Sequence, residues 1–458
     1  MVNEATAVIL AAGQGTRMKS NMAKVLHKAG GKTLVEHVIA AAQGIVPAER
    51  VFVVVGHQAE SVEAVAKAAG ADAIHQTEQL GTGHAVMCGR GKLAPLGGLL
   101  LVLNGDCPMI RTETLEALIR LYRETGAGAA MITTDLDDPT GYGRIVRRPN
   151  GDVEAIVEHK AATPEQLRVR EINVGFYCFD AAAFWKHVDE LRTDNPAHEY
   201  YLTDMIAILL KAGHRVTALK AADSSEMLGI NNRVELAAVD RIMRDRKVRQ
   251  LMLDGVTVEK PETVTIDGDV AIGTDTIIGP FAQITGKTAI GANCRIGASS
   301  IIENSTLGDG VEVFPFSSIS DSTLDAKAHV GPYARLRMGA HLHEGAHVGN
   351  FVELKKTDLG AGSKSMHLAY LGDSQIGAKV NIGAGTITCN YDGKKKHRTH
   401  IGDGAFVGSN STLVAPIEVG SGSYVGAGST ITHRVPEKAL AIGRSRQVNK
   451  EGWVKKES

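Results

Sequence analysis

The first half of the chain alternates between short apolar runs and longer segments with helical periodicity. The apolar runs cover residues 6–10, 51–55 and 99–103, and the helical segments include 34–42, 61–69 and 112–123. Continuous apolar strands separated by helices are typical of a parallel sheet covered on both faces. We therefore expect a Rossmann-like, doubly wound α/β domain over residues 1–231, with ligands bound at the carboxyl ends of its strands.

A single long helix is predicted for residues 232–253. Apolar residues keep helical spacing along one face, while arginines, Lys247 and Asp245 fill the other. Asn232 can cap its start, and Gly255 lies just past its end. We expect residues 232–254 to link two domains.

From residue 270 onward, the hydrophobic period changes to six. The aliphatic positions are Ile272, Ile278, Ile284, Ile290, Ile296, Ile302, Leu307, Val313, Ile319, Leu324, Val330, Leu336, Leu342, Val348, Leu354, Ile376, Ile382, Ile401, Val407, Leu413, Val419, Val425 and Ile431. Such hexads are the signature of a parallel β-helix, in which each hexad is a short strand plus a corner. Three hexads close one triangular coil of eighteen residues. We predict a left-handed parallel β-helix with a C-terminal tail over residues 255–458.

Composition and charge argue against several classes of protein function. The 458 residues carry 50 Lys plus Arg against 51 Asp plus Glu, a formal net charge of −1, which argues against binding to nucleic acid or a membrane surface. The five cysteines are scattered without C-x-x-C spacing, so we expect neither a zinc motif nor a disulfide framework, and we expect a cytoplasmic protein. The N-terminus lacks a basic leader, and no apolar run is long enough to span a bilayer.

A glycine-containing loop follows the first predicted strand. Residues 10–18 match neither the Walker loop nor the dinucleotide fingerprint. A glycine turn that enters a helix nevertheless presents backbone N–H groups to an anion, and Arg17 and Lys24 add positive charge. The loop is therefore either a triphosphate site or a plain strand-to-helix turn.

Two further segments lie at the same edge of the predicted sheet. Asp106 follows a buried strand and is either a turn former or a magnesium ligand. Residues 76–83 offer amide side chains and glycines that allow close backbone approach to a ligand.

The hexad period also predicts which side chains share a face of the solenoid. Arg337 and Lys355 are eighteen residues apart and should point outward from neighbouring coils. Two such cations either bind a phosphate or are independently solvated. His367 lies where the aliphatic hexad is interrupted; it is either a general base lifted out of register or a surface histidine.

A second column consists of small residues. Ala384, Ser409 and Ala427 each lie two positions after an inward aliphatic, provided that residues 388–400 form a strand with a bulged loop. Their groove would accommodate an extended pantetheine arm, with Arg444 beyond the last coil near the phosphates of coenzyme A. Packing of small residues at a corner is the alternative.

Several strings resemble the sugar nucleotidyltransferases and, over nearly the whole chain, the bacterial bifunctional N-acetylglucosamine-1-phosphate uridyltransferase/glucosamine-1-phosphate N-acetyltransferase family. The supporting segments are 10–24, 79–84, 137–144, 156–160, 171–173, 199–204 and 229–233. Two positions depart from the family pattern, because Ala23 and Met338 stand where proline is usual.

The resemblance implies uridylyl transfer from UTP to N-acetylglucosamine 1-phosphate in the N-terminal domain. It implies that Arg17 and Lys24 stabilise charge, that Mg²⁺ binds Asp106 and Asn231, and that the nucleotide and sugar contact Leu10, Ala11, Ala12, Gly13, Lys24, Gln76, Gly81, Thr82, Asn104, Gly105, Asp106, Gly143, Glu158, Asn173 and Asn231. From the residues alone, Asn231 is better explained as a helix cap.

For the solenoid, the resemblance implies acetyl transfer from acetyl-CoA to glucosamine 1-phosphate, with His367 as general base, in a homotrimer that shares its sites between subunits. The implied sugar-phosphate ligands are Arg337, Lys355, Tyr370, Asn381, Asn390 and Lys396, and the implied acetyl-CoA ligands are Ala384, Asn390, Tyr391, Ser409, Ala427 and Arg444. The product would be UDP-N-acetylglucosamine, a precursor of peptidoglycan and lipopolysaccharide.

Other interpretations stay open. The β-helix could merely assemble a single-activity nucleotidyltransferase, or the whole chain could be an inactive scaffold. His341, His343 and His347 suggest a metal cluster, but we set this aside because their spacing straddles the inward-facing Leu342. Cys389 has no neighbouring motif that would make it a nucleophile.

Overall fold

A computed structural model describes residues 4–159, 162–195 and 197–454 and divides the chain into two compact units. Unit 1 covers residues 1–243 and unit 2 covers residues 244–458. Each unit has its own hydrophobic core. None of the helices in the described ranges combines the length and the apolar character needed to cross a membrane.

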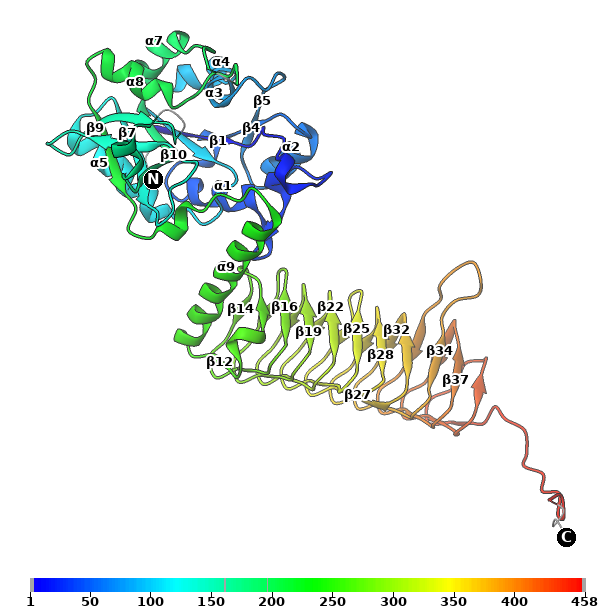
Figure 1. Ribbon diagram of the computed structural model, residues 1–458. Coiled ribbons are helices and arrows are strands. Elements are labelled where there is room, and N and C mark those ends of the chain that lie inside the picture. The colour runs from blue at the N-terminus through cyan, green and yellow to red at the C-terminus, as the bar shows by residue number, and fades with distance from the viewer. Residues whose placement is uncertain (1–3, 160–161, 196, 455–458) are drawn as a thin grey trace. The chain divides into compact units, whose positions relative to one another are not determined.

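A nine-stranded sheet forms the centre of unit 1 (Figure 1). Its main path runs β11 (Val216–Lys220), β7 (Ala129–Asp135), β10 (Glu171–Asp180), β6 (Leu99–Asn104), β1 (Ala5–Leu10), β4 (Val51–Val55) and β5 (Asp72–His75). Strands β8 (Arg144–Arg147) and β9 (Val153–Val157) form a hairpin beside β10, and β2 (Lys28–Ala29) pairs with β3 (Lys32–Thr33) elsewhere. The expected parallel pairing is confirmed for β6, β1, β4 and β5 and for β7 with β11. In contrast, β10 runs antiparallel to both β6 and β7, and the β8–β9 hairpin is antiparallel too.

Helices cover both faces of this sheet, as the apolar strands predict. One face carries α1 (Leu34–Gln43), α2 (Ala59–Ala68) and α5 (Thr112–Thr125); the other carries α3 (Thr82–Met87), α4 (Arg90–Leu93), α7 (Ala181–His187) and α8 (Asp204–Lys211). A short α6 (Pro164–Leu167) contacts β8. Successive residues of β4 alternate between the two cores, because neighbouring side chains of a strand point to opposite faces.

Strand β1 lies at the point where the order of the sheet reverses. The chain continues from β1 to β4 on one side and later reaches β6 on the other, and all three strands are parallel. In such sheets the loops after the strands diverge at this point and leave a crevice.

The predicted long helix is α9 (Arg233–Leu253). Asn232 caps it, since its Oδ1 accepts hydrogen bonds from the backbone N–H groups of Val234 and Glu235 at 2.9 and 3.0 Å. Val239 packs in a core of unit 1, whereas Val248 and Leu251 belong to the core of unit 2.

Unit 2 is a solenoid whose strands form three parallel sheets (Figure 1). The first sheet contains β12 (Thr257–Val258), β15 (Ile277–Ile278), β18 (Arg295–Ile296), β21 (Glu312–Val313), β24 (His329–Val330), β27 (His347–Asn350), β30 (Lys364–His367), β33 (Asn381–Ile382), β36 (Phe406–Val407), β39 (Tyr424–Val425) and β41 (Leu440–Ala441). The second contains β13 (Thr265–Ile266), β16 (Gln283–Thr285), β19 (Ile301–Glu303), β22 (Ser318–Ser320), β25 (Arg335–Arg337), β28 (Glu353–Lys355), β31 (Tyr370–Gly372), β34 (Ile387–Cys389), β37 (Thr412–Val414) and β40 (Thr430–Ile431). The third contains β14 (Ala271–Ile272), β17 (Ala289–Ile290), β20 (Thr306–Leu307), β23 (Thr323–Leu324), β26 (His341–Leu342), β29 (Asp358–Leu359), β32 (Ser374–Ile376), β35 (Thr399–Ile401) and β38 (Ile417–Val419).

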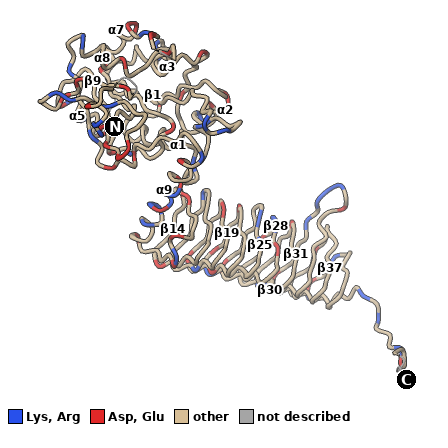
Figure 2. Tube along the Cα trace, viewed as in Figure 1, with Lys and Arg blue, Asp and Glu red and all other residues tan. Residues whose placement is uncertain are grey.

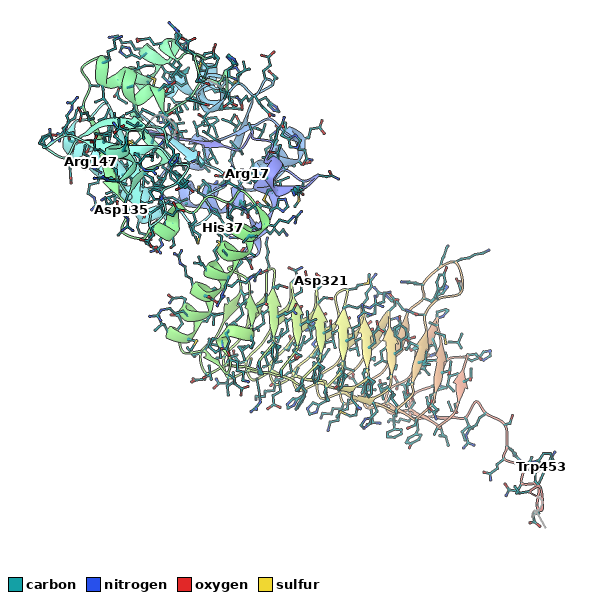
Figure 3. The ribbon with its side chains drawn as sticks, in the orientation of Figure 1. Arg17, His37, Asp135, Arg147, Asp321 and Trp453 are labelled. Carbon is teal, nitrogen blue, oxygen red and sulfur yellow. The ribbon has the colours of Figure 1, made fainter. Side chains whose placement is uncertain are left out.

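The hexad residues form one continuous inner stack, with Ile272 packed at its edge. Polar side chains project outward from the coils (Figure 3). We expected the hexad to be interrupted near residue 367, but in the structure it continues through this segment. Ser365 occupies the inward position between Val348 and Ile382 and is fully buried. The hexad was missed in the sequence because this inward residue is not aliphatic.

Glycine often follows the inward aliphatic because the next coil approaches closely. A Cβ on Gly383 would lie 2.5 Å from the backbone nitrogen of Ser409, and one on Gly408 would lie 2.5 Å from that of Ala427. Any side chain at these positions would push successive coils apart.

Candidate active sites

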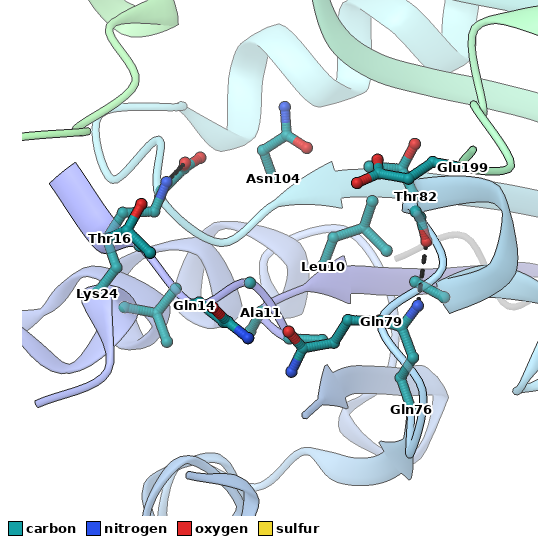
Figure 4. A pocket seen from close by; sticks show the side chains of 17 residues that line it. Leu10, Ala11, Gln14, Thr16, Lys24, Gln76, Gln79, Thr82, Asn104 and Glu199 are labelled. Atoms are coloured by element: carbon teal, nitrogen blue, oxygen red, sulfur yellow. Dashed lines mark hydrogen bonds and ion pairs between the residues drawn. The ribbon is translucent and has the colours of Figure 1, made fainter. Parts of the chain in front are cut away.

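A pocket of about 660 Å³ lies at the carboxyl end of β1 in unit 1 (Figure 4). Ten of the predicted ligands line it: Leu10, Ala11, Ala12, Gly13, Lys24, Gln76, Gly81, Thr82, Asn104 and Asp106. The other seven lining residues were not among the predicted ligands: Gln14, Gly15, Thr16, Val25, Gln79, Ala85 and Glu199. Several of them fall in motifs that had been identified, but only the folded loops show that they face the cavity.

The loop after β1 brings Lys24 to the pocket. Gly15 has φ +60°, and a Cβ at that position would lie 2.5 Å from Cβ of Lys24. Both the backbone conformation and the close approach therefore require glycine at position 15.

Positive and oxygen-bearing groups meet beside this loop. The Lys24 ammonium is ion-paired with Asp106, and it lies 3.4 Å from Oδ1 of Asn231. The same Asn231 oxygen accepts a 2.7 Å hydrogen bond from Nη2 of Arg17. The interpretation of Asn231 as a helix cap is therefore wrong, because Asn232 makes the cap and Asn231 turns toward the two cations.

This donor set fits a hard divalent cation. A carboxylate oxygen of Asp106 and an amide oxygen of Asn231 both reach one ammonium group, so they already converge on a single positive charge. Oxygen donors of these types are those that Mg²⁺ prefers.

The wall opposite the glycine loop is built by residues 76–84. Gln76 is 4% exposed, and its Nε2 donates a 3.1 Å hydrogen bond to the carbonyl of Gly81 (Figure 4). Gly81 has φ +102°, and a Cβ there would meet the carbonyl of Tyr200 at 2.7 Å. The Thr82 hydroxyl accepts from the N–H of Leu202, which fixes this turn against the segment that carries Glu199.

The predicted sugar ligands lie together beside β8, β9 and β10. The N–H of Asn173 donates to the carbonyl of Gly143 at 2.9 Å, and a Cβ on Gly143 would lie 3.3 Å from Oε1 of Glu158. Asn104 donates to the carbonyl of Val174 at 3.0 Å, and Gly105 N–H donates to the carbonyl of Leu10. Lys160, at the end of the 156–160 motif, lies outside the described residues.

Gln58 holds the loop at the position where the chain departs from the family pattern. Its Oε1 accepts a 2.8 Å hydrogen bond from the N–H of Ala23, and its Nε2 donates to the carbonyl of Asn21. Ala23 has φ −54°, a value that proline also adopts, but proline could not donate this bond. The side chain of Gln58 therefore restrains the loop that proline would otherwise stiffen.

In unit 2, the structure confirms the predicted alignment of Arg337 with Lys355. The two residues are register partners in the parallel strands β25 and β28. Each cation, however, has its own carboxylate: Arg337 Nε lies 2.7 Å from Glu353 Oε1, and Lys355 Nζ lies 3.0 Å from Asp373 Oδ2. Lys355 is 4% exposed, so the alternative that the two cations are independently solvated is wrong.

Asn390, Tyr370 and Lys396 join this cluster. Asn390 Nδ2 donates to Asp373 at 2.5 Å and lies 3.5 Å from the Tyr370 hydroxyl. Burial alone would raise the pKa of Asp373, but hydrogen bonds from Lys355 and Asn390 outweigh it and lower that pKa. A hydrogen bond with Lys396 raises the pKa of Lys355, and the same contact lowers the pKa of Lys396.

His367 stands at the head of the predicted column of small residues. It is the register partner of Asn350, and Ala384 occupies the equivalent position one coil later. Nδ1 of His367 lies 2.8 Å from Oδ1 of Asn350. An amide oxygen only accepts, so this contact favours the tautomer with a proton on Nδ1 and a free lone pair on Nε2.

The column continues through Ser409 and Ala427 toward Arg444. The N–H of Asn410 donates to the carbonyl of Ala384, and that of Gly428 donates to the carbonyl of Ser409, which confirms the alignment across the long insertion. Arg444 Cδ would lie 3.7 Å from a Cβ on Gly428. Tyr391 is 59% exposed and begins a projecting loop rich in lysine (Figure 2).

One predicted ligand lies apart from the others within a single chain. Asn381 begins β33 and is the register partner of Lys364, at the opposite end of the strand from His367. It thus belongs to the first sheet, whereas Arg337, Lys355 and Tyr370 belong to the second.

Comparisons with known proteins match different family models to the N-terminal and C-terminal parts of the chain. The model of the MobA-like NTP transferase domain matches residues 7–254, and that of the bacterial transferase hexapeptide (six repeats) matches residues 269–304 and 398–433. Similar relatives named "Bifunctional protein GlmU" come from Solibacter usitatus (60% identical, covering 98% of this chain and 97% of the relative), Koribacter versatilis (53%, 98% and 96%) and Pelobacter propionicus (47%, 98% and 97%).

The restraint by Gln58 can be tested directly. We expect Gln58→Ala to speed backbone hydrogen exchange of residues 20–26, because the loop loses both contacts. Adding Ala23→Pro in that background should slow exchange again, since φ at position 23 already suits proline. Mass spectrometry of peptides from this region measures the change, and a peptide from α5 serves as control. Unchanged exchange in Gln58→Ala would show that the loop is held by other contacts.

Proposed function

The chain belongs to the GlmU family of bifunctional enzymes, and from this premise we propose how its two sites make UDP-N-acetylglucosamine. Unit 2 transfers an acetyl group from acetyl-CoA to glucosamine 1-phosphate. Unit 1 then transfers a uridylyl group from UTP to the acetylated sugar phosphate. We propose that residues 1–231 and 255–458 carry the two reactions and that residues 232–254 join them. The observation that supports this most strongly is that each unit gathers its own cluster of polar and charged residues, beside a pocket in unit 1 and along neighbouring coils in unit 2.

In unit 1, we propose that the pocket beside β1 holds UTP. Gln76, Gly81 and Thr82 would contact uracil, and the backbone of residues 10–13 would lie along the nucleotide, with Asn104 and Gly105 beside it. Gly143, Glu158 and Asn173 would hold the sugar. A phosphate oxygen of N-acetylglucosamine 1-phosphate then attacks the α-phosphorus in line, the bond to the bridging oxygen breaks, and pyrophosphate leaves.

Arg17 and Lys24 would stabilise the negative charge that develops during this step. Both cations lie beside Asp106 and Asn231, so the site can place fixed positive charge against the leaving pyrophosphate. We propose that Asp106 and Asn231 would hold Mg²⁺, which when bound neutralises phosphate charge. With the metal bound, the Lys24 ammonium would be released from Asp106 and become available to the triphosphate.

In unit 2, we propose that His367 is the general base for acetyl transfer. Asn350 orients its ring so that Nε2 can take a proton from the sugar amine as that amine attacks the thioester carbonyl. The carbon–sulfur bond breaks and the thiolate of coenzyme A leaves with the proton. Acetyl-CoA would lie along Ala384, Ser409 and Ala427 toward Arg444, with its acetyl end near His367, Asn390 and Tyr391.

The sugar phosphate would bind across the second sheet. Arg337, Lys355 and Lys396 are three cations beside two carboxylates, Glu353 and Asp373, so the cluster retains an attraction for phosphate. Tyr370 and Asn390 would position the sugar ring.

We further propose a homotrimer with shared acetyl-transfer sites. Asn381 lies on a different sheet from Arg337, so a complete site would draw on a neighbouring chain. A column of exposed apolar side chains follows the same corner as His367: Phe281, Phe316, Tyr333, Phe351 and Leu368. The ring centroids of Phe316 and Tyr333 are 5.0 Å apart, and those of Tyr333 and Phe351 are 5.5 Å apart. Burial against a second chain would cover this column. We place the enzyme in the cytoplasm, where its product feeds cell-wall synthesis.

The two reactions should fail independently. Asp106→Ala should reduce uridylyl transfer by roughly 10²-fold or more, because the charge arrangement at the phosphates is lost. His367→Ala should reduce acetyl transfer by about 10²–10⁴-fold, the usual contribution of a general base. Pyrophosphate release and coenzyme A release, measured separately on each variant, distinguish the activities. Loss of both activities in either variant would contradict independent sites.

The lowered pKa of Lys396 predicts a pH dependence. As pH rises, Lys396 loses its proton before an ordinary lysine would, so the cluster loses positive charge and binds phosphate less well. In Lys396→Arg, the guanidinium stays charged. We expect the ratio of wild-type to variant kcat/KM for glucosamine 1-phosphate to fall as the pH rises toward the ordinary lysine pKa of about 10.4. The ratio cancels every pH effect that the two proteins share, and a flat ratio would exclude this role for Lys396.

A further inference from the structure

Two histidines and an aspartate meet on the third sheet of the solenoid. His341 and His343 flank the inward-facing Leu342 in and after β26. Alternate residues of a strand point to the same side, so both imidazoles face outward. Leu324 is the register partner of Leu342, which places Asp325 beside His343 on the neighbouring coil.

The three side chains approach one another as metal ligands do. His341 Nε2 lies 3.0 Å from Asp325 Oδ1, and His343 Nδ1 lies 3.3 Å from Asp325 Oδ2. One ligand atom from each residue lies within 4.8 Å of the other two, and the imidazole rings are 4.0 Å apart. Donors at 2.0–2.1 Å from a tetrahedral zinc ion are separated by about 3.3 Å, so only small side-chain movements are needed.

A second carboxylate lies near the cluster. Asp358 belongs to the next coil and is the register partner of His341, with its Oδ1 3.9 Å from His341 Nδ1. This separation is longer than a hydrogen bond, so Asp358 adds negative charge beside the cluster and does not fix the ring.

We propose that Asp325, His341 and His343 form a binding site for one transition-metal cation of the zinc class. Two imidazoles and one carboxylate favour zinc, nickel or copper over magnesium, which prefers oxygen donors. The three side chains are 31–40% exposed, so a solvent cation can reach them, and water can complete the coordination. The ion would join the coils of β23 and β26 at an outer face of the solenoid.

The structure corrects the reason for which this cluster was set aside. Straddling Leu342 brings His341 and His343 together rather than apart, and the carboxylate that completes the site comes from the preceding coil. His347 is not part of it, because this residue lies on the first sheet and stacks against His329 with 4.4 Å between ring centroids.

Metal binding to the untagged, full-length chain tests the proposal. The protein is stripped with chelator and dialysed, excess Mg²⁺ is added to saturate the oxygen-donor site, and Zn²⁺ is then titrated. We expect one Zn²⁺ per chain by elemental analysis and a higher melting temperature of the solenoid, because only the folded chain gathers the ligands. X-ray absorption at the zinc edge should show two imidazole ligands.

Variants identify the ligands. His341→Gln, His343→Gln and Asp325→Asn should each weaken zinc affinity by more than roughly tenfold. His400 is an exposed histidine on the same sheet, so His400→Gln should leave the affinity unchanged. Circular dichroism and both transferase activities, which these surface residues do not serve, verify that each variant is folded. Failure of the wild-type chain to bind stoichiometric zinc, or undiminished binding by the His341→Gln/His343→Gln double variant, would overturn the proposal.

Discussion

The stacking register of the solenoid is the constraint on which the second half of this protein depends. Each inward aliphatic lies against its counterpart one coil away, and glycines after it allow the backbones to approach closely. Once the inner stack is fixed, every outward side chain is fixed too, because a shift by one residue would expose the whole hydrophobic row. Residues far apart in sequence thereby become neighbours without any loop having to place them.

The same register explains how the residues of the proposed acetyl-transfer site come to lie in one row. Asn350, His367, Ala384, Ser409 and Ala427 occupy one position in successive coils. The proposed base, which is hydrogen-bonded to Asn350, therefore stands at one end of this row of residues, and Arg444 stands near the other. In unit 1 the residues of the site are brought together in another way. The pocket lies where the order of the sheet reverses at β1, and several loops supply the residues that line it.

Much of this arrangement could be predicted from the sequence. Strands β1, β4 and β6, helix α9 and the hexad rows follow from periodicity, and the structure confirms them. The alignment of Arg337 with Lys355 follows from counting residues, and the structure confirms it as well. The antiparallel β10 was missed because apolar runs do not reveal strand direction.

Side-chain partners were harder to predict than positions. Ser365 concealed one turn of the repeat, because a buried serine does not look like a core residue in sequence. The carboxylates of Glu353 and Asp373 were overlooked, since nothing local marks them as partners of Arg337 and Lys355. Gln58 and Asn350 act through contacts with residues 35 and 17 positions away, which only the folded chain brings together.

A crystal structure of the full-length enzyme with glucosamine 1-phosphate and coenzyme A bound tests the central claim most directly. The account predicts that the phosphate contacts both Arg337 and Lys355, that the sugar amine faces Nε2 of His367, and that the pantetheine arm follows Ala384, Ser409 and Ala427. A phosphate bound on another sheet, or an amine remote from His367, would contradict the derivation of the acetyl-transfer site from the coil register.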